Sequence, residues 1–209
     1  MPAHATVRAM NVAFRQAWTL ELFLTWEQQQ ELRYEFDGFQ PVAMAGGTYA
    51  HDTIAMNLAA ELRNRLRGTS CRPHGSNLKI EVMGRVRYPD AYVTCGTYQR
   101  DSKFGHDPVV IFEVLSDDDP NRDLVEKNQE YRATPSVQRY VVLEQTSAAA
   151  LVFARKGTEW ISEIVAGADA ILRLPEIGIE IPLTELYDGI DLSSAAAGGE
   201  PEPTDQTEG

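Results

Sequence analysis

Three stretches decide the expected fold: YPDAYV at residues 88–93, VVIFEVLS at 109–116 and RDLVEKNQEY at 122–131. Asp90 follows a proline and heads an apolar run, and Glu113 stands inside an apolar run where an acid is unexpected. Lys127 belongs to a segment with helical spacing that begins just after that second run. Two carboxylates on adjacent strands, with an ammonium group beside them, are suited to holding a divalent metal ion against a phosphate.

Glu113 is the most informative of these residues because of its surroundings. The nearly continuous apolar run over 109–115 is typical of a strand buried on both faces. Side chains of a strand alternate between its faces, so Ile111, Glu113 and Leu115 are expected on the same face. A carboxylate there costs several kcal/mol unless something pairs with it. Two partners fit the sequence: an arginine in a buried salt bridge, or a metal ion shared with Asp90.

Lys127 is four residues from Asp123 and shares one face of the predicted helix with it. This spacing commonly gives an ion pair on a solvated face, worth about 0.3–0.5 kcal/mol. The alternative is that the helix returns across the strand that carries Glu113 and brings Lys127 to the carboxylates. Asp119 and Pro120 suit the start of this helix, and its end is expected before Pro135.

Composition limits the classes of protein and the compartment that fit the chain. Its 209 residues suit one domain, and its net charge of -12 argues against gripping nucleic acid through bulk positive charge. A local basic groove, or a site made cationic by metal, is still compatible. We predict an extension over 1–18, a folded domain over 19–192 and a disordered acidic tail over 193–209. No signal peptide or membrane span is recognised, so the expected location is the cytoplasm.

Local signals place most of the remaining elements. Thr19 is a candidate helix cap, Asp37-Gly38 suits a β-hairpin turn, and leucine spacing over 49–67 predicts a helix closed by Gly68. Two strands joined at Met83-Gly84 are expected within 76–95, one over 108–116, one over 137–145, and a meander after it. This order predicts an α/β fold in which helices flank a mixed sheet.

Two further groups of residues have more than one interpretation. Arg63, Arg65 and Arg67 crowd the end of the helix over 49–67, where they fit either the helix dipole or a phosphate-binding edge. Cys95 lies in a predicted strand and is expected to be a buried small apolar residue. A disulfide with Cys71 is compatible with the sequence, but two cysteines make no framework.

Several motifs occur in a telling order: RYEFDG at 33–38, His51 opening a leucine-spaced helix, YPDAYV at 88–93, VIFEVLS at 110–116, RDLVEKNQEY at 122–131 and RYVVLE at 139–144. In this order and spacing the chain resembles the Uma2 family, restriction-endonuclease-like proteins of the PD-(D/E)xK nuclease superfamily. The resemblance covers about residues 22–192 and implies an α/β fold with a restriction endonuclease-like core.

The resemblance also implies a metal site. Asp90 and Glu113 are expected to bind Mg²⁺ or Mn²⁺, and the backbone carbonyl of Val114 to complete the shell. In the superfamily a lysine usually stands two residues after the second acid, but that position is Leu115 here. Lys127 is therefore expected to supply the ammonium group from the helix.

Two more residues match family positions near the site. Glu35 matches an acid that binds metal or orients a water molecule. His51 matches a position at the helix start, where it acts as a general base or as a capping or packing residue. The family's common Ser-Pro after the second acid reads Ser116-Asp117 here, and Asp117–Asp119 are either extra metal ligands or loop and cap residues.

The leading functional hypothesis is a Mg²⁺- or Mn²⁺-dependent endonuclease that hydrolyses phosphodiester bonds of DNA and acts as a homodimer. A rival of another class is a catalytically inactive protein that keeps the fold for dimerisation or partner binding, which the acidic charge favours. A metal-dependent phosphoesterase on an unrelated fold is the third hypothesis.

Overall fold

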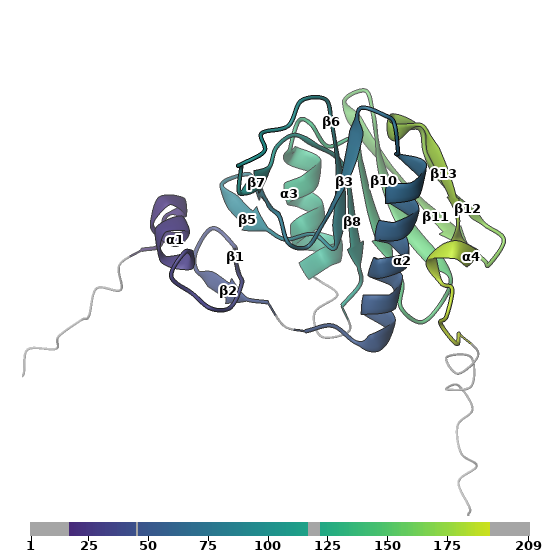
Figure 1. Cartoon of the computed structure of the whole chain (residues 1–209), viewed down its shortest axis with the longest axis horizontal. Helices are drawn as coiled ribbons and strands as arrows, with labels where there is room; N and C mark the ends of the chain where they lie inside the picture. The colour runs from purple at the N-terminus through teal and green to yellow at the C-terminus, as the bar shows by residue number, and fades with distance from the viewer. Residues whose placement is uncertain (1–16, 45, 117–121, 193–209) are drawn as a thin grey trace, which may run out of the picture.

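A six-stranded mixed sheet forms the centre of the molecule (Figure 1). The computed structural model describes residues 17–44, 46–116 and 122–192. The strand order is β11-β10-β9-β8-β6-β3, and only β8 and β9 pair in parallel within this sheet. Its strands are β3 (Cys71–Gly75), β6 (Ala91–Cys95), β8 (Pro108–Val114), β9 (Arg139–Leu143), β10 (Ala149–Lys156) and β11 (Glu159–Ala166).

Helices cover both faces of this sheet, as predicted. On one face, α2 (Tyr49–Arg65) packs against Phe112 of β8 through apolar residues spaced four apart, Ile54, Leu58 and Leu62. The other face carries η1 (Arg122–Lys127), a π-helical turn, and α3 (Asn128–Ala133). Ile111 packs there against Tyr131, so the side chains of β8 alternate between two separate cores.

A smaller five-stranded sheet lies beside the central one, with the order β2-β1-β5-β4-β7. α1 (Leu20–Glu27) packs on it through Phe23, whose ring stacks on that of Phe36 at 5.1 Å between centroids. Thr19 caps α1 by accepting a hydrogen bond from the backbone of Leu22. The strands are β1 (Tyr34–Phe36), β2 (Pro41–Ala43), β4 (Lys79–Val82), β5 (Arg85–Arg87) and β7 (Phe104–Gly105).

The C-terminal part of the described chain adds a hairpin and a short helix. They share the apolar core of α2, to which Leu172, Leu174, Ile181, Leu183 and Leu186 contribute buried side chains. The elements are β12 (Ile171–Leu174), η2 (Pro175–Ile177), β13 (Ile179–Pro182) and α4 (Leu183–Leu186). No helix in the described ranges is long and apolar enough to cross a lipid bilayer.

The predicted hairpin at Asp37-Gly38 is confirmed, and Gly38 has a positive φ angle of 92°. α2 ends at Arg65, with Leu66 as its C-cap, which is earlier than predicted, and Gly68 has a φ angle of 82° in the turn that follows. The segment 76–95 differs from the prediction because it holds three strands instead of two. β5 and β6 belong to different sheets, since Pro89 between them lacks a backbone donor and the ladder cannot continue through it. β3 was not predicted.

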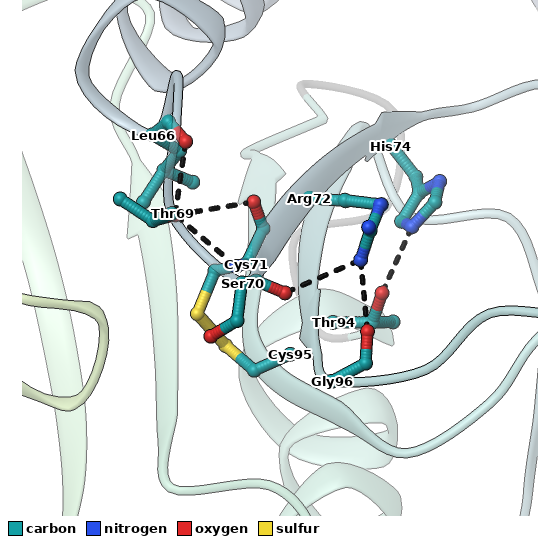
Figure 2. The surroundings of a disulfide bond; sticks show 9 residues. All are labelled: Leu66, Thr69, Ser70, Cys71, Arg72, His74, Thr94, Cys95 and Gly96. Carbon is teal, nitrogen blue, oxygen red and sulfur yellow. Dashed lines mark hydrogen bonds between the residues drawn. A yellow bond between two sulfur atoms is a disulfide. The ribbon is translucent and has the colours of Figure 1, made fainter.

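The expectation that Cys95 is a buried apolar residue is wrong. Cys95 is exposed at the end of β6 and forms a disulfide with Cys71, which lies opposite it on the edge strand β3 (Figure 2). Of the extension predicted over 1–18, only residues 17 and 18 are described, and Trp18 packs against the core around Phe23. The predicted tail over 193–209, and Asp117–Asp119 with Pro120, lie outside the described residues.

Candidate functional site

A cavity of about 220 Å³ opens where β8 ends and β6 begins. Its walls come from β1, the start of α2, the residue before β6, the end of β8 and the π-helical turn. Apart from Asp117–Asp119, which lie outside the described residues, this arrangement brings together the residues that the sequence predicted for the site. Val114 lines the cavity, as do residues with polar side chains: Glu35, His51, Tyr88, Asp90, Glu113, Ser116, Arg122, Asp123 and Lys127.

The register of β6 and β8 sets the two predicted acids side by side. Ala91 pairs with Phe112, so Asp90 and Glu113 are next to one another across the antiparallel ladder. The backbone N–H of Val114 donates to Oδ2 of Asp90 at 2.8 Å. This hydrogen bond orients the Asp90 carboxylate beside β8, and the predicted adjacency of the two acids is confirmed.

Lys127 lines the cavity and contacts two of its carboxylates. Its Nζ is 3.0 Å from Oε1 of Glu113 and 2.8 Å from Oδ1 of Asp123, and all three side chains are buried. The predicted approach of Lys127 to Glu113 is therefore confirmed. The alternatives that Glu113 pairs with an arginine, and that Lys127 and Asp123 face solvent, are both wrong.

Two buried tyrosines donate hydrogen bonds to this cluster. The Tyr131 hydroxyl donates to Oε1 of Glu113 at 2.7 Å, and the Tyr140 hydroxyl donates to the backbone carbonyl of Asp123 at 3.0 Å. Asp123 belongs to the π-helical turn, a geometry that occurs often at functional sites. The wider turn brings Asp123 and Lys127 into the cavity together, which the four-residue spacing alone did not reveal.

Glu35 reaches the cavity from β1 but is engaged by the protein's own donors. Oε2 accepts from Arg87 at 3.1 Å and from Arg122, and Oε1 accepts from the backbone of Tyr88 at 3.0 Å. Burial favours the protonated carboxyl, but Lys127, Arg87 and Arg122 outweigh it and hold the pKa of Glu35 below its usual value. Glu35 thus anchors Arg122 at the cavity wall.

Arg87 forms a second ionic layer that the sequence analysis missed. Its guanidinium is fully buried and donates to both oxygens of Glu130 at 2.7 and 2.6 Å, as well as to Glu35. This arginine connects β5 of the small sheet to α3 on the central sheet. The alternation of arginine and valine at 85–87 was visible in the sequence. No local pattern indicated that Glu130, 43 residues away, would pair with Arg87.

His51 makes one contact through its backbone at the helix start and another through its ring in the cavity. Its backbone N–H donates to the Thr48 hydroxyl that caps α2, while its ring Nε2 lies 3.2 Å from Oδ2 of Asp90. A side chain at Gly47 would come within 2.9 Å of the ring, so glycine there allows the close approach. The hydrogen bond to Asp90 raises the pKa of His51 against the opposing effect of burial.

The cavity contains more carboxylates than its cations balance. Burial raises the pKa of Glu113 to about 8; Lys127 opposes this rise, while Asp123, Asp90 and Glu35 add to it. Burial favours the neutral amine of Lys127, but Glu113, Glu35 and Asp123 outweigh it and raise the pKa of Lys127. Burial and the neighbouring carboxylates therefore favour the protonated form of Glu113, and the carboxylates favour the ammonium form of Lys127.

The donor set fits a hard divalent cation. Asp90 uses Oδ2 and Glu113 uses Oε1 for their recorded hydrogen bonds and ion pairs, so Oδ1 and Oε2 are the oxygens to offer a metal. Within the described ranges, no three His, Cys, Asp or Glu side chains are arranged to hold an ion by themselves. Magnesium commonly binds one or two carboxylates and completes its shell with water and substrate phosphate, which suits this pair.

The mixed sheet, with neighbouring acids at its strand ends and a lysine from the following helix, has the architecture of the restriction-endonuclease-like class. The chain belongs to the Uma2 family, whose sequence profile, described as "Putative restriction endonuclease", matches residues 20–184. An uncharacterized protein of Synechocystis sp. (strain ATCC 27184 / PCC 6803 / Kazusa), slr1290, is 30% identical over 174 residues, which are 81% of this chain and 91% of that protein.

A solved structure shows the same fold. The crystal structure of a protein from Anabaena variabilis ATCC 29413, described as "a putative nuclease belonging to DUF820", superposes with a TM-score of 0.70. The superposition covers 81% of this chain and 97% of the Anabaena chain, at 14% sequence identity. At this identity the likeness concerns the fold, and it confirms the predicted fold class.

Proposed function

We propose that the protein is a Mg²⁺- or Mn²⁺-dependent endonuclease that hydrolyses phosphodiester bonds of DNA. One observation carries the proposal: Asp90, Glu113 and a buried Lys127 converge in one cavity of a chain from an endonuclease-like family. Asp90 and Glu113 would hold the cation, with the carbonyl of Val114 beside them. When bound, such a cation supplies polarisation of the scissile phosphate and a lowered pKa of water.

Lys127 is suited to stabilise negative charge on the phosphate during the reaction. Its raised pKa keeps the ammonium protonated throughout the neutral range, so it is unsuited to accept a proton. Its buried position strengthens its interaction with a developing charge, because little water screens it. Arg122, anchored by Glu35, provides a second cation at the cavity wall.

His51 is assigned a positioning function in this scheme. A general base has to be deprotonated at the working pH, whereas the contact with Asp90 favours the protonated imidazole. The ring therefore orients the Asp90 carboxylate, and its substitution should weaken metal binding more than it alters the pH profile of cleavage.

Cleavage of supercoiled plasmid DNA with Mg²⁺ or Mn²⁺ tests the proposal. The native protein should nick the plasmid, and Asp90→Asn and Glu113→Gln should abolish nicking. Lys127→Met should slow it by about 10²–10³-fold, the loss typical of removing one charge-stabilising group. Lys103→Met is the matched control, because Lys103 is an exposed lysine outside the cavity. Absence of nicking with either metal would favour a catalytically inactive interaction protein.

We further propose a homodimer, because two copies of one cavity can each cut one strand of a duplex. The predicted dimer is measured by light scattering during size-exclusion chromatography. A monomer at micromolar concentration that still cuts both strands at one position contradicts the dimer, while the proposed chemistry would stand.

A further inference from the structure

A second polar pocket, of about 390 Å³, lies at the C-terminal end of α2, away from the candidate site. Three arginines line it: Arg63 from the last turn of α2, Arg67 from the turn that follows α2, and Arg72 from β3. Within the described residues, no Asp or Glu lines this pocket. In a chain with a net charge of -12, three arginines around one hollow make a local positive site.

The arginines at the end of α2 differ in their partners. Arg65 is neutralised by Glu61 and Glu185 on another side of the helix. Arg63 and Arg67 are exposed, and neither forms an ion pair with any residue in the described ranges. Arg63 lies in the last turn of α2 and Arg67 lies just after its end, and both line the pocket, where their like charges repel. An anion between them would remove that repulsion.

Arg72 is held in place before any ligand arrives (Figure 2). Its NH1 group donates to the carbonyl oxygens of Ser70 at 3.3 Å and Gly96 at 2.8 Å, and its guanidinium lies 4.6 Å from the ring centroid of Tyr98. These contacts use NH1 and leave the donors on Nε and NH2. A fixed, planar guanidinium with free donors is well suited to recognising a phosphate.

The surrounding turn is rigid as well. The Cys71–Cys95 disulfide joins β3 to β6 immediately beside Arg72. The Thr69 hydroxyl donates to the carbonyl of Leu66 at 2.9 Å and accepts from the backbone N–H of Cys71 at 3.1 Å. The pocket is therefore fixed between the end of α2 and the start of β3.

Its position relates it to the candidate site. His51 lies in the first turn of α2, and Arg63 lies twelve residues later in the last turn. This corresponds to about 18 Å along the helix at 1.5 Å per residue. Duplex DNA rises about 3.4 Å per base pair, so the same length corresponds to about five base pairs. A duplex held at the site and running along α2 would bring a backbone phosphate to the pocket.

We propose that the pocket formed by Arg63, Arg67 and Arg72 binds a backbone phosphate of a polynucleotide, about five base pairs from the bond that is cut. The inference rests on the proposed endonuclease function and extends it to how the substrate is held. The alternative function of Arg63 and Arg67 is to complement the dipole at the end of α2, which would affect helix stability alone.

Fluorescence anisotropy with a labelled duplex, in EDTA so that no cleavage occurs, tests the proposal. Arg63→Gln/Arg67→Gln should weaken binding of a duplex of about twenty base pairs by about tenfold or more, as expected for lost charge-assisted hydrogen bonds. The slope of log K against log salt should fall by about one. Arg132→Gln/Arg173→Gln removes two exposed arginines elsewhere and should change affinity much less.

Further measurements separate the possible outcomes. A duplex stem of about four base pairs is too short to span the two sites, so the double substitution should reduce its affinity much less than that of the longer duplex. Inorganic phosphate could raise the Tm of the native protein but not that of Arg63→Gln/Arg67→Gln. If it does so while the two proteins bind the duplex equally well, the pocket binds free phosphate and the polynucleotide assignment is overturned. A lowered Tm with unchanged duplex affinity also overturns it, in favour of the dipole function.

Failure of this inference is distinguishable from failure of the proposed function. If the native protein cuts DNA and the double variant binds it equally well, only the phosphate pocket is refuted. If the duplex binds and the double variant loses affinity, but no cleavage occurs with Mg²⁺ or Mn²⁺, the pocket is supported and the endonuclease function fails.

Discussion

Replacement of Arg87 by methionine should strongly destabilise the protein, because this arginine connects the two sheets beneath the candidate site. Its side chain is fully buried and carries a paired hydrogen bond to Glu130 and a single one to Glu35. Methionine fills similar space but provides no charge. The substitution would leave two buried carboxylates with fewer partners, although Arg85 lies 3.3 Å from Glu130 and Arg122 contacts Glu35.

The expected loss is about 3–5 kcal/mol of unfolding free energy, the usual cost of removing one partner of a buried ion pair. For a protein of this size that corresponds to a fall in Tm of about 6–20 °C. Urea unfolding followed by circular dichroism measures the free energy, and calorimetry measures Tm. Arg87→Met/Glu130→Leu should recover part of the loss, because the second substitution removes one of the stranded carboxylates.

The matched control is Arg173→Met, since Arg173 forms an exposed ion pair with Glu180. It should change stability by less than about 1 kcal/mol. If Arg87→Met unfolds within about 1 kcal/mol of the native protein, the buried ionic layer does not stabilise the fold and the reasoning is refuted.

Two further predictions concern stability. Burial raises the folded-state pKa of Glu113 to about 8, so folding favours the protonated carboxyl and the metal-free protein should lose stability as pH rises from about 4.5 to 8. Glu113→Gln should flatten this dependence in urea titrations at several pH values. An equal slope of stability against pH in both proteins contradicts the prediction. Gly105→Ala should cost about 1–3 kcal/mol, because its Cβ would lie 2.0 Å from the hydroxyl of buried Tyr92, whereas Gly46→Ala, which meets nothing within 4 Å, should melt like the native protein.

Elements with strong local signals were predictable from the sequence. β8 is recognisable because it is a nearly continuous apolar run of strand length, the pattern of a strand buried on both faces. α2 is recognisable because leucines recur at helical spacing between Thr48 and Gly68. The position of Glu113 within a buried strand follows from the first of these signals. Lys127 stood out from its place in the helix after β8, and the family resemblance then matched it to the lysine of the superfamily.

Other features depend on contacts between distant residues and were not predictable. Arg87 meets Glu35 and Glu130 across separations of 52 and 43 residues, and no local pattern encodes such pairs. The π-helical turn that buries Asp123 has the same spacing as an ordinary solvated helix. Cys95 looked apolar because its strand is apolar, but its position at the strand end opposite Cys71 decides its state.

The cytoplasmic location stays a prediction, and it bears on the disulfide between Cys71 and Cys95. Disulfides persist in oxidising compartments and are rare in the cytosol. In a reducing compartment the two cysteines would be thiols, and the turn beside Arg72 would lose one of its constraints. Duplex affinity measured with and without reductant should therefore differ, while both states keep the candidate site unchanged.

Binding of Mn²⁺, measured by isothermal titration calorimetry in the absence of DNA, tests the metal site most directly. The native protein should bind the ion at millimolar or lower concentration, and Asp90→Asn and Glu113→Gln should each abolish binding. Lys127→Met should bind at least as tightly as the native protein, because it removes the ammonium that competes for Glu113. No binding by the native protein, or undiminished binding by Glu113→Gln, would contradict the assignment of this cavity as a metal-dependent nuclease site.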